Sequence, residues 1–191
     1  MKRVSIIGPT DLDRLSELLG LSAKQILDMA VRVGEIIADA GHELWVNPDG
    51  GMLAAVAEAY KAHGGKKLVV LVPQSSDPWP TNHAQPYVQT ADQVEMRPSW
   101  FHTNYAVVSE VDICICVGLS TGTFSELAYI KWDVKHDSPT TKLRKLLAVR
   151  ELIRGGELPP EFFGKLGDVL RYVNAIEELS ALLEERDDIV G

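Results

Sequence analysis

Short apolar runs alternate with helical patterns along most of the 191-residue chain. The runs predict β-strands at residues 4–7, 44–46, 68–72, 113–117, 146–149 and 170–173. The patterns between them predict helices at residues 22–41, 52–63, 100–111 and 177–185, and one from Thr121 or Thr123 to about Trp132. The run at 68–72 contains only Val and Leu, which is typical of a strand buried on both faces.

Strands that alternate with helices of this length are joined by right-handed crossovers, which place the strands parallel in one sheet. The length of the chain favours one domain, and the sequence contains no internal repeat. The pattern therefore predicts a single α/β domain over residues 1–191, with a mostly parallel, doubly wound sheet covered by helices on both faces. Ligands of such sheets bind beyond the carboxyl ends of the strands.

Segment 74–99 departs from this alternation, because it is rich in Pro, Ser, Asp, Asn and Gln. We expect no regular structure there, and long segments of this kind often serve as a binding loop or a lid. Trp79, Tyr87 and Trp100 lie in or beside the segment and could stack on a base. The alternative is that they are ordinary packing residues.

Composition narrows the classes of function. Nineteen basic and twenty-seven acidic side chains give a net charge of −8, which argues against a general nucleic-acid binder. The apolar run after the N-terminus is too short for a signal peptide, and no stretch has the length of a membrane helix. Cys114 and Cys116 would share one strand face as free thiols. We therefore expect a cytoplasmic protein with no membrane and no nucleic-acid partner.

The turn before the fourth predicted helix along the chain carries the strongest chemical signal. It reads Gly118, Leu119, Ser120, Thr121, Gly122 and Thr123. Glycines allow close approach of a ligand to the backbone, while hydroxyls and the free amides of a helix start can bind a phosphate. The alternative is a capping box, with Thr123 as N-cap and Glu126 three residues later. Two other turns, Gly8-Pro9-Thr10 and 48–51, also join a strand to a helix.

Several common motifs are absent from the sequence. It contains no P-loop, no G-x-G-x-x-G fingerprint after a strand and no G-x-S-x-G nucleophile turn. The five histidines and two cysteines do not have the spacing of metal ligands, so we expect no metal site.

Residues 118–126 resemble the P-G-G-x-G-T-x-x-E signature of the Lonely Guy-like proteins, which are also called lysine decarboxylase-like. Residues 51–57 resemble the G-L-M-G-A-V-A segment of that family. Shorter matches at Gly41-His42, Gly64-Gly65, Val72-Pro73 and Asp112 follow in family order. The resemblance extends over about residues 4–185.

The resemblance implies a Rossmann-like fold that binds nucleotides, requires no further cofactor and usually forms a homodimer. The best-known members cleave the N-glycosidic bond of nucleoside 5′-monophosphates, and relatives include molybdenum cofactor carrier proteins. By position, Glu126 would be the catalytic carboxylate, acting on an oxocarbenium-like transition state. The residues assigned to the nucleotide and its phosphate are Gly8, Pro9, Gly50, Gly51, Met52, Asn104, Gly118, Ser120, Thr121, Gly122 and Thr123.

The chain departs from the family at three places, one of which is the short cluster Pro48-Asp49-Gly50-Gly51 in place of a longer run of glycines. Gly118-Leu119-Ser120 replaces Pro-Gly-Gly, and the arginine of the enzymatic signature aligns with Thr103. Arg97 is the nearest substitute, as a catalytic residue or as a plain solvated charge. The leading interpretation is a protein that binds a phosphorylated small molecule, either a nucleotide or a nucleotide-derived cofactor. The alternative is a phosphoribohydrolase that uses Glu126 and Arg97, and single-stranded DNA binding is a third option that the charge opposes.

Overall fold

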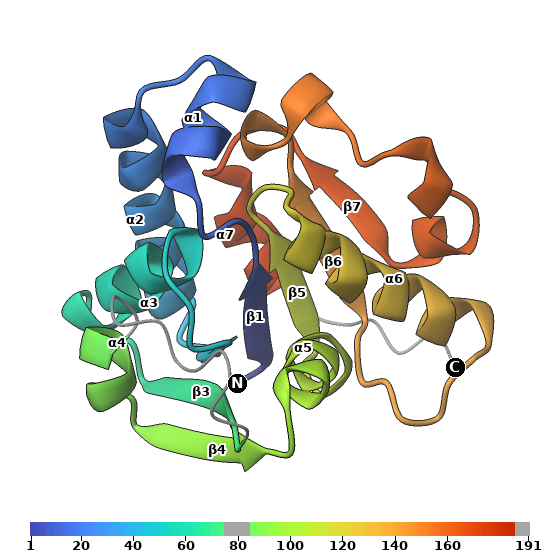
Figure 1. Ribbon diagram of the computed structural model, residues 1–191, viewed down its shortest axis with the longest axis horizontal. Helices are drawn as coiled ribbons and strands as arrows, with labels where there is room; N and C mark the ends of the chain where they lie inside the picture. Colours follow the sequence, from blue (N-terminus) through green and yellow to red (C-terminus); the bar gives the residue numbers. More distant parts are fainter. Residues whose placement is uncertain (75–84, 186–191) are drawn as a thin grey trace.

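The computed structural model describes residues 1–74 and 85–185, and within these ranges seven strands form one parallel sheet (Figure 1). The strands are β1 (Arg3–Ile7), β2 (Glu43–Val46), β3 (Lys67–Pro73), β4 (Gln93–Arg97), β5 (Ile113–Cys116), β6 (Lys145–Val149) and β7 (Leu170–Val173). The helices are α1 (Leu12–Leu19), α2 (Ala23–Asp39), α3 (Met52–Ala62), α4 (Gln85–Gln89), α5 (Trp100–Ser109), α6 (Thr121–Lys135) and α7 (Glu178–Glu184). Short 3₁₀ turns connect β6 to β7, namely η2 (Arg150–Leu152), η3 (Arg154–Gly156), η4 (Pro160–Phe162) and η5 (Lys165–Asp168).

The order of the strands across the sheet creates a switch point between β1 and β5. The order is β4-β3-β2-β1-β5-β6-β7, so the chain builds one half of the sheet outward from β1 and then returns to start the other half at β5. Val4 of β1 pairs with Leu44 of β2 on one side and with Ile113 of β5 on the other. Because the connections leave β1 and β5 in opposite directions, a crevice opens beyond their carboxyl ends.

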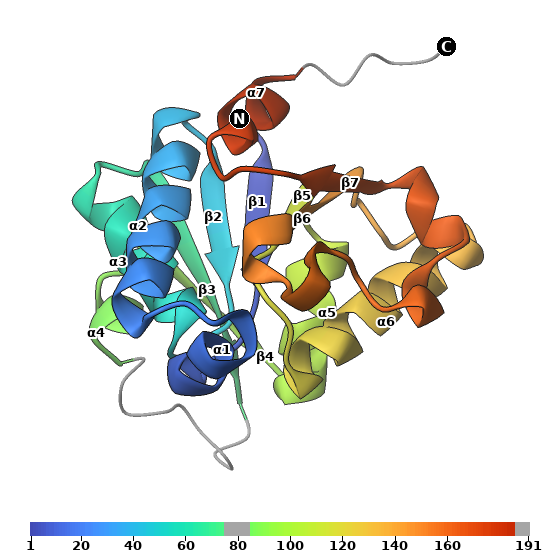
Figure 2. The same ribbon diagram turned by 90° about the horizontal axis from the view of Figure 1, so that it is seen from above.

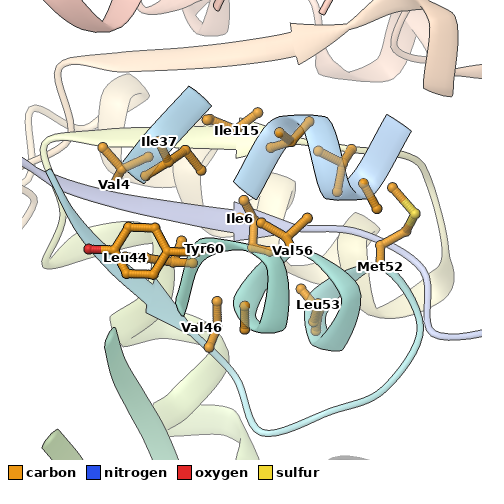
Figure 3. Close-up of a cluster of buried hydrophobic side chains, with 14 of the residues drawn as sticks. Val4, Ile6, Ile37, Leu44, Val46, Met52, Leu53, Val56, Tyr60 and Ile115 are labelled. Carbon is orange, nitrogen blue, oxygen red and sulfur yellow. The ribbon is translucent and has the colours of Figure 1, made fainter. Parts of the chain in front are cut away.

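Helices cover both faces of the sheet and enclose two hydrophobic clusters. Helices α2, α3 and α7 pack on one face, while α5 and α6 pack on the other (Figure 2). Side chains alternate between the two faces, so Ile6 lies in the first cluster and Ile7 in the second. Figure 3 shows the first cluster, where Ile6, Val56 and Met52 meet between the sheet and its helices.

The doubly wound parallel fold expected from the sequence is confirmed, and the predicted helices and strands lie within a few residues of their expected positions. The prediction of an irregular segment at 74–99 is wrong for its second half, which contains α4 and β4. Strand β4 lies at the edge of the sheet and is largely exposed, so its sequence lacks the apolar run of a buried strand. Residues 75–84, which include Trp79, lie outside the described residues.

Helix α1 is the other element that the sequence pattern did not reveal. It has eight residues and buries one side chain, Leu15. Asp11 caps its start by accepting a hydrogen bond from the Arg14 amide, and Gly20 ends it in the left-handed conformation. A helix this short shows little periodicity, because two turns contain few core positions.

Cys114 and Cys116 are free and buried on one face of β5, as predicted. Within residues 1–74 and 85–185, no helix combines the length and the apolar character needed to span a membrane.

Candidate functional site

A pocket of about 530 Å³ opens at the switch point, beyond the carboxyl ends of β1 and β5. Its walls come from five segments, namely the connection after β1, helix α1, the end of β2 and the starts of α5 and α6. It is lined by Gly8, Pro9, Thr10, Asp11, Arg14, Leu15, Leu18, Asn47, Asp49, Leu53, Trp100, Asn104, Leu119, Ser120, Thr121, Gly122, Thr123 and Glu126. Most of the residues that the sequence assigned to a ligand therefore share one pocket.

The start of α6 forms one wall of this pocket. Ser120 is the N-cap, and its Oγ accepts a hydrogen bond of 3.2 Å from the amide of Thr123. The capping box with Thr123 as N-cap is therefore wrong. The amides of Thr121 and Gly122 are the first two of the helix, so neither has an acceptor within it. Among the described residues, the atom nearest to a Cβ added at Gly122 would be Ser120 Oγ at 3.7 Å, so there is open space beside this residue at the helix start.

Glu126 lies at the floor of the pocket and is 7% exposed. Asn47, which follows β2, donates from Nδ2 to Oε1 of Glu126 at 3.2 Å and to Oδ1 of Asn104 at 2.9 Å. Burial raises the pKa of Glu126 to about 8, with a further increase from the charge of Asp49, although the hydrogen bond from Asn47 opposes both. The side chain is therefore protonated at neutral pH, so it can donate a proton or a hydrogen bond.

Asn47 is a site residue that the sequence analysis missed. The backbone carbonyl oxygen of Asn47 accepts a 2.5 Å hydrogen bond from the hydroxyl of Tyr87 in α4. The same hydroxyl also donates to the backbone carbonyl of Asp49 at 2.8 Å. Tyr87 is fully buried and holds this loop in place, so it is a packing residue, whereas Trp100 lines the pocket. The position of Asn47 directly after a buried strand was the available signal.

Helix α1 brings a second missed residue to the pocket. Asp11, Arg14, Leu15 and Leu18 all line it, and their spacing of three and four places them on one face of the helix. Arg14 donates to Glu17 at 2.8 Å, and both side chains are more than half exposed. Arg14 could not be found because the helix that carries it was not predicted.

Four of the residues assigned to the nucleotide have other surroundings. Gly50, Gly51, Met52 and Gly118 are not among the residues that line the pocket. Gly51 has φ +59°, and a Cβ there would lie 2.4 Å from the backbone of Thr10. The structure therefore places Gly51 where it lets the connection after β2 pack against the connection after β1.

Arg97 ends the edge strand β4, away from the pocket lining. Its guanidinium donates to Glu95 and to Glu110, each at 2.7 Å. Thr103, at the position of the family arginine, is buried and donates to the carbonyl of Trp100 at 2.9 Å. The sequence-based substitute for the missing arginine is therefore engaged with two carboxylates outside the pocket.

The parallel sheet and the pocket at its switch point define a Rossmann-like α/β protein. The sequence model of the SLOG cluster4 family matches residues 1–138, and the chain belongs to this family. This assignment agrees with the Lonely Guy-like resemblance that the motifs indicated.

Proteins with related sequences and structures are consistent with this assignment. A protein of Archaeoglobus fulgidus is 27% identical over 129 residues, which cover 67% of this chain and 72% of the relative. The molybdenum cofactor carrier protein of Chlamydomonas reinhardtii has a TM-score of 0.64 at 15% identity, over 96% of each chain. The molybdenum cofactor binding protein of Rippkaea orientalis has a TM-score of 0.65 at 16% identity, over 96% of this chain and 95% of its own. At such identities the structural likeness shows the fold alone.

Proposed function

We propose that this protein binds a nucleotide or a nucleotide-derived cofactor, with the phosphate of the ligand at the turn from Gly118 to Thr123. The observation that carries the proposal is the open start of α6, where the amides of Thr121 and Gly122 lack intrahelical acceptors in a pocket wall. Such amides, together with the positive end of the helix dipole, form a favourable environment for an anion.

The size and chemistry of the pocket support a ligand larger than phosphate. A volume of about 530 Å³ lies within the range of pockets that enclose small molecules, roughly 300–1,000 Å³. Two structural neighbours are named for molybdenum cofactor, a pterin compound with a phosphate, and this supports a ligand of nucleotide-like composition. The homodimer implied by the family stays a prediction.

Gly122→Val tests the phosphate site. The branched side chain would occupy the open space at the helix start and block two amide hydrogen bonds, while no atom of the described residues lies within 3.4 Å of the added Cβ. Because hydrogen bonds to a charged group contribute about 1.5–3 kcal/mol each, we expect an affinity loss of about 100-fold or more. Calorimetry with adenosine and guanosine 5′-monophosphates and with ribose 5-phosphate would measure it.

Gly167→Val is the matched control, because no atom in the described part of the chain lies within 4 Å of the Cβ position of Gly167, which is outside the pocket. Circular dichroism should report a native fold for both variants. Unchanged affinity in a folded Gly122→Val protein would overturn the phosphate assignment.

A phosphoribohydrolase is the second candidate, and the buried carboxyl of Glu126 in the pocket is the observation in its favour. A carboxyl with a pKa near 8 could protonate the departing base of a nucleotide at neutral pH. It could stabilise a ribosyl cation as a carboxylate only above that pH. Arg97 would not contact the substrate in such a reaction, because its guanidinium forms ion pairs with Glu95 and Glu110.

Incubation of nucleoside 5′-monophosphates with the protein, followed by chromatography, separates the two functions. We expect intact nucleotides, because no arginine replaces the family residue at position 103. Release of free base by the wild type, and not by Glu126→Gln, would instead establish the hydrolase. A rate that falls above pH 8 would then identify Glu126 as the proton donor.

A further inference from the structure

The pocket has an uneven distribution of charge. Asp11, Asp49 and Glu126 contribute carboxyl groups to its walls, and Arg14 is the only basic residue among those that line it in the described part of the chain. Glu126 is neutral at pH 7 because of its raised pKa, but an anion would still meet the charges of Asp11 and Asp49. The amides at the start of α6 alone would have to offset the repulsion between these carboxylates and the anion, unless a cationic side chain also contacts the anion.

Arg14 is placed to supply that cation. The face of α1 that carries Asp11, Arg14 and Leu18 lines the same pocket as the start of α6. Figure 2 shows α1 and the beginning of α6 at the same end of the sheet. A guanidinium from α1 and backbone amides from α6 can therefore contact one phosphate group together.

Arg14 can leave its ion pair with Glu17 and bind a phosphate instead. Arg14 and Glu17 form an exposed ion pair on α1, with side chains that are 63% and 69% exposed. Such exposed pairs contribute little to stability, because both groups remain solvated when they separate. A planar guanidinium binds a phosphate through two parallel hydrogen bonds, which is stronger than its contact with Glu17.

A second, independent feature indicates that the pocket is built around a ligand. The side chain of Asn47 is 4% exposed and lines the pocket, yet its Oδ1 has no hydrogen-bond partner within the described residues. Both hydrogens of its amide are already used for Asn104 and Glu126. A buried acceptor without a donor is rare in folded proteins, and a hydroxyl or N–H group of a ligand would satisfy it.

We propose that Arg14 is an anion-binding residue of this pocket, which leaves Glu17 and binds the phosphate of the ligand together with the start of α6. The ligand would carry a phosphate at this end and a hydrogen-bond donor near Asn47. This inference rests on the proposed phosphate site.

Arg14→Gln tests the proposal with Arg32→Gln as its control. Arg32 forms an equivalent pair with Glu35 three residues later on α2, at 3.2 Å, and does not line this pocket. We expect Arg14→Gln to weaken binding of ribose 5-phosphate and of nucleoside 5′-monophosphates by about 10- to 100-fold and to reduce its salt dependence. Arg32→Gln should bind as the wild type does.

Glu17→Gln distinguishes a binding role from a structural one. Removal of the competing carboxylate frees the guanidinium, so we expect affinity to rise a few-fold, whereas loss of a merely structural ion pair would not raise it. Wild-type affinity in both Arg14→Gln and Glu17→Gln would overturn the role of Arg14. If Gly122→Val still abolished binding in that case, the phosphate site would stand without Arg14. No binding of these compounds to the wild type would overturn both.

Discussion

Gly51→Ala is expected to destabilise the folded protein by more than about 3 kcal/mol, although Gly51 lies outside the hydrophobic core. Two effects add at this position. The backbone has φ +59° and ψ −128°, a conformation that residues with a Cβ rarely adopt. The added methyl would also lie 2.4 Å from the Cα and carbonyl oxygen of Thr10, and these are backbone atoms that cannot rotate away. Thermal unfolding followed by circular dichroism should show a midpoint about 10 °C lower.

Gly20→Ala provides the matched control for this prediction. Gly20 also has a positive φ, +67°, but no atom of residues 1–74 and 85–185 lies within 4 Å of its Cβ position. It should lose only the conformational contribution, about 1 kcal/mol. The difference between the two variants therefore measures the collision with Thr10. Equal losses would show that the connection after β2 can move away from the connection after β1.

The fold could be predicted because buried parallel strands have an unambiguous pattern. Runs such as the one in β3 are apolar throughout, and the helices between them keep their periodicity because each packs one face on the sheet. Elements with little burial were missed for the same reason. Strand β4 has one neighbouring strand and exposes Val94 and Met96, and α1 buries a single side chain.

The candidate site could be predicted where its residues lie close together in the sequence. Ser120 to Thr123 share a turn, and the turn itself indicates an anion site. Asn47 and Arg14 could not be found in this way, because their place in the pocket depends on the order of strands and on a helix without a clear pattern. The glycine at position 51 was predicted to contact the nucleotide, and the structure places it outside the pocket lining. Sequence alone does not separate a glycine that admits a ligand from one that admits another loop.

Glu126 gives the protein a stability that depends on pH, and the sign follows from its raised pKa. The folded state holds the proton up to about pH 8, while the unfolded chain loses it near the ordinary value of 4.5. Below pH 4.5 both states are protonated, so the group has no effect on the free energy of unfolding. Between these values the unfolded state binds fewer protons, and stability falls by about 1.4 kcal/mol per pH unit. Above pH 8 the loss is complete, on the order of several kcal/mol.

Glu126→Gln should therefore stabilise the protein at pH 8 by several kcal/mol and raise its unfolding midpoint by about 10 °C. Glutamine keeps the shape and the acceptor for Asn47, so the hydrogen bond of 3.2 Å can remain. The difference between the two proteins should shrink as pH falls and vanish near pH 4. Glu58→Gln, an exposed change on α3, is the control and should leave the pH profile of the wild type unaltered.

Equal stability of Glu126→Gln and the wild type at pH 8 would contradict this account of the carboxyl. The predicted gain in stability bears on function. If glutamine makes the folded protein more stable than Glu126 does, the stability of the fold does not explain the carboxyl at this position. The placement of Glu126 beside Asn47 at the floor of the pocket supplies a different reason for it. A bound phosphate would add negative charge nearby and hold the proton more firmly, so ligand binding should weaken as the pH rises above 8.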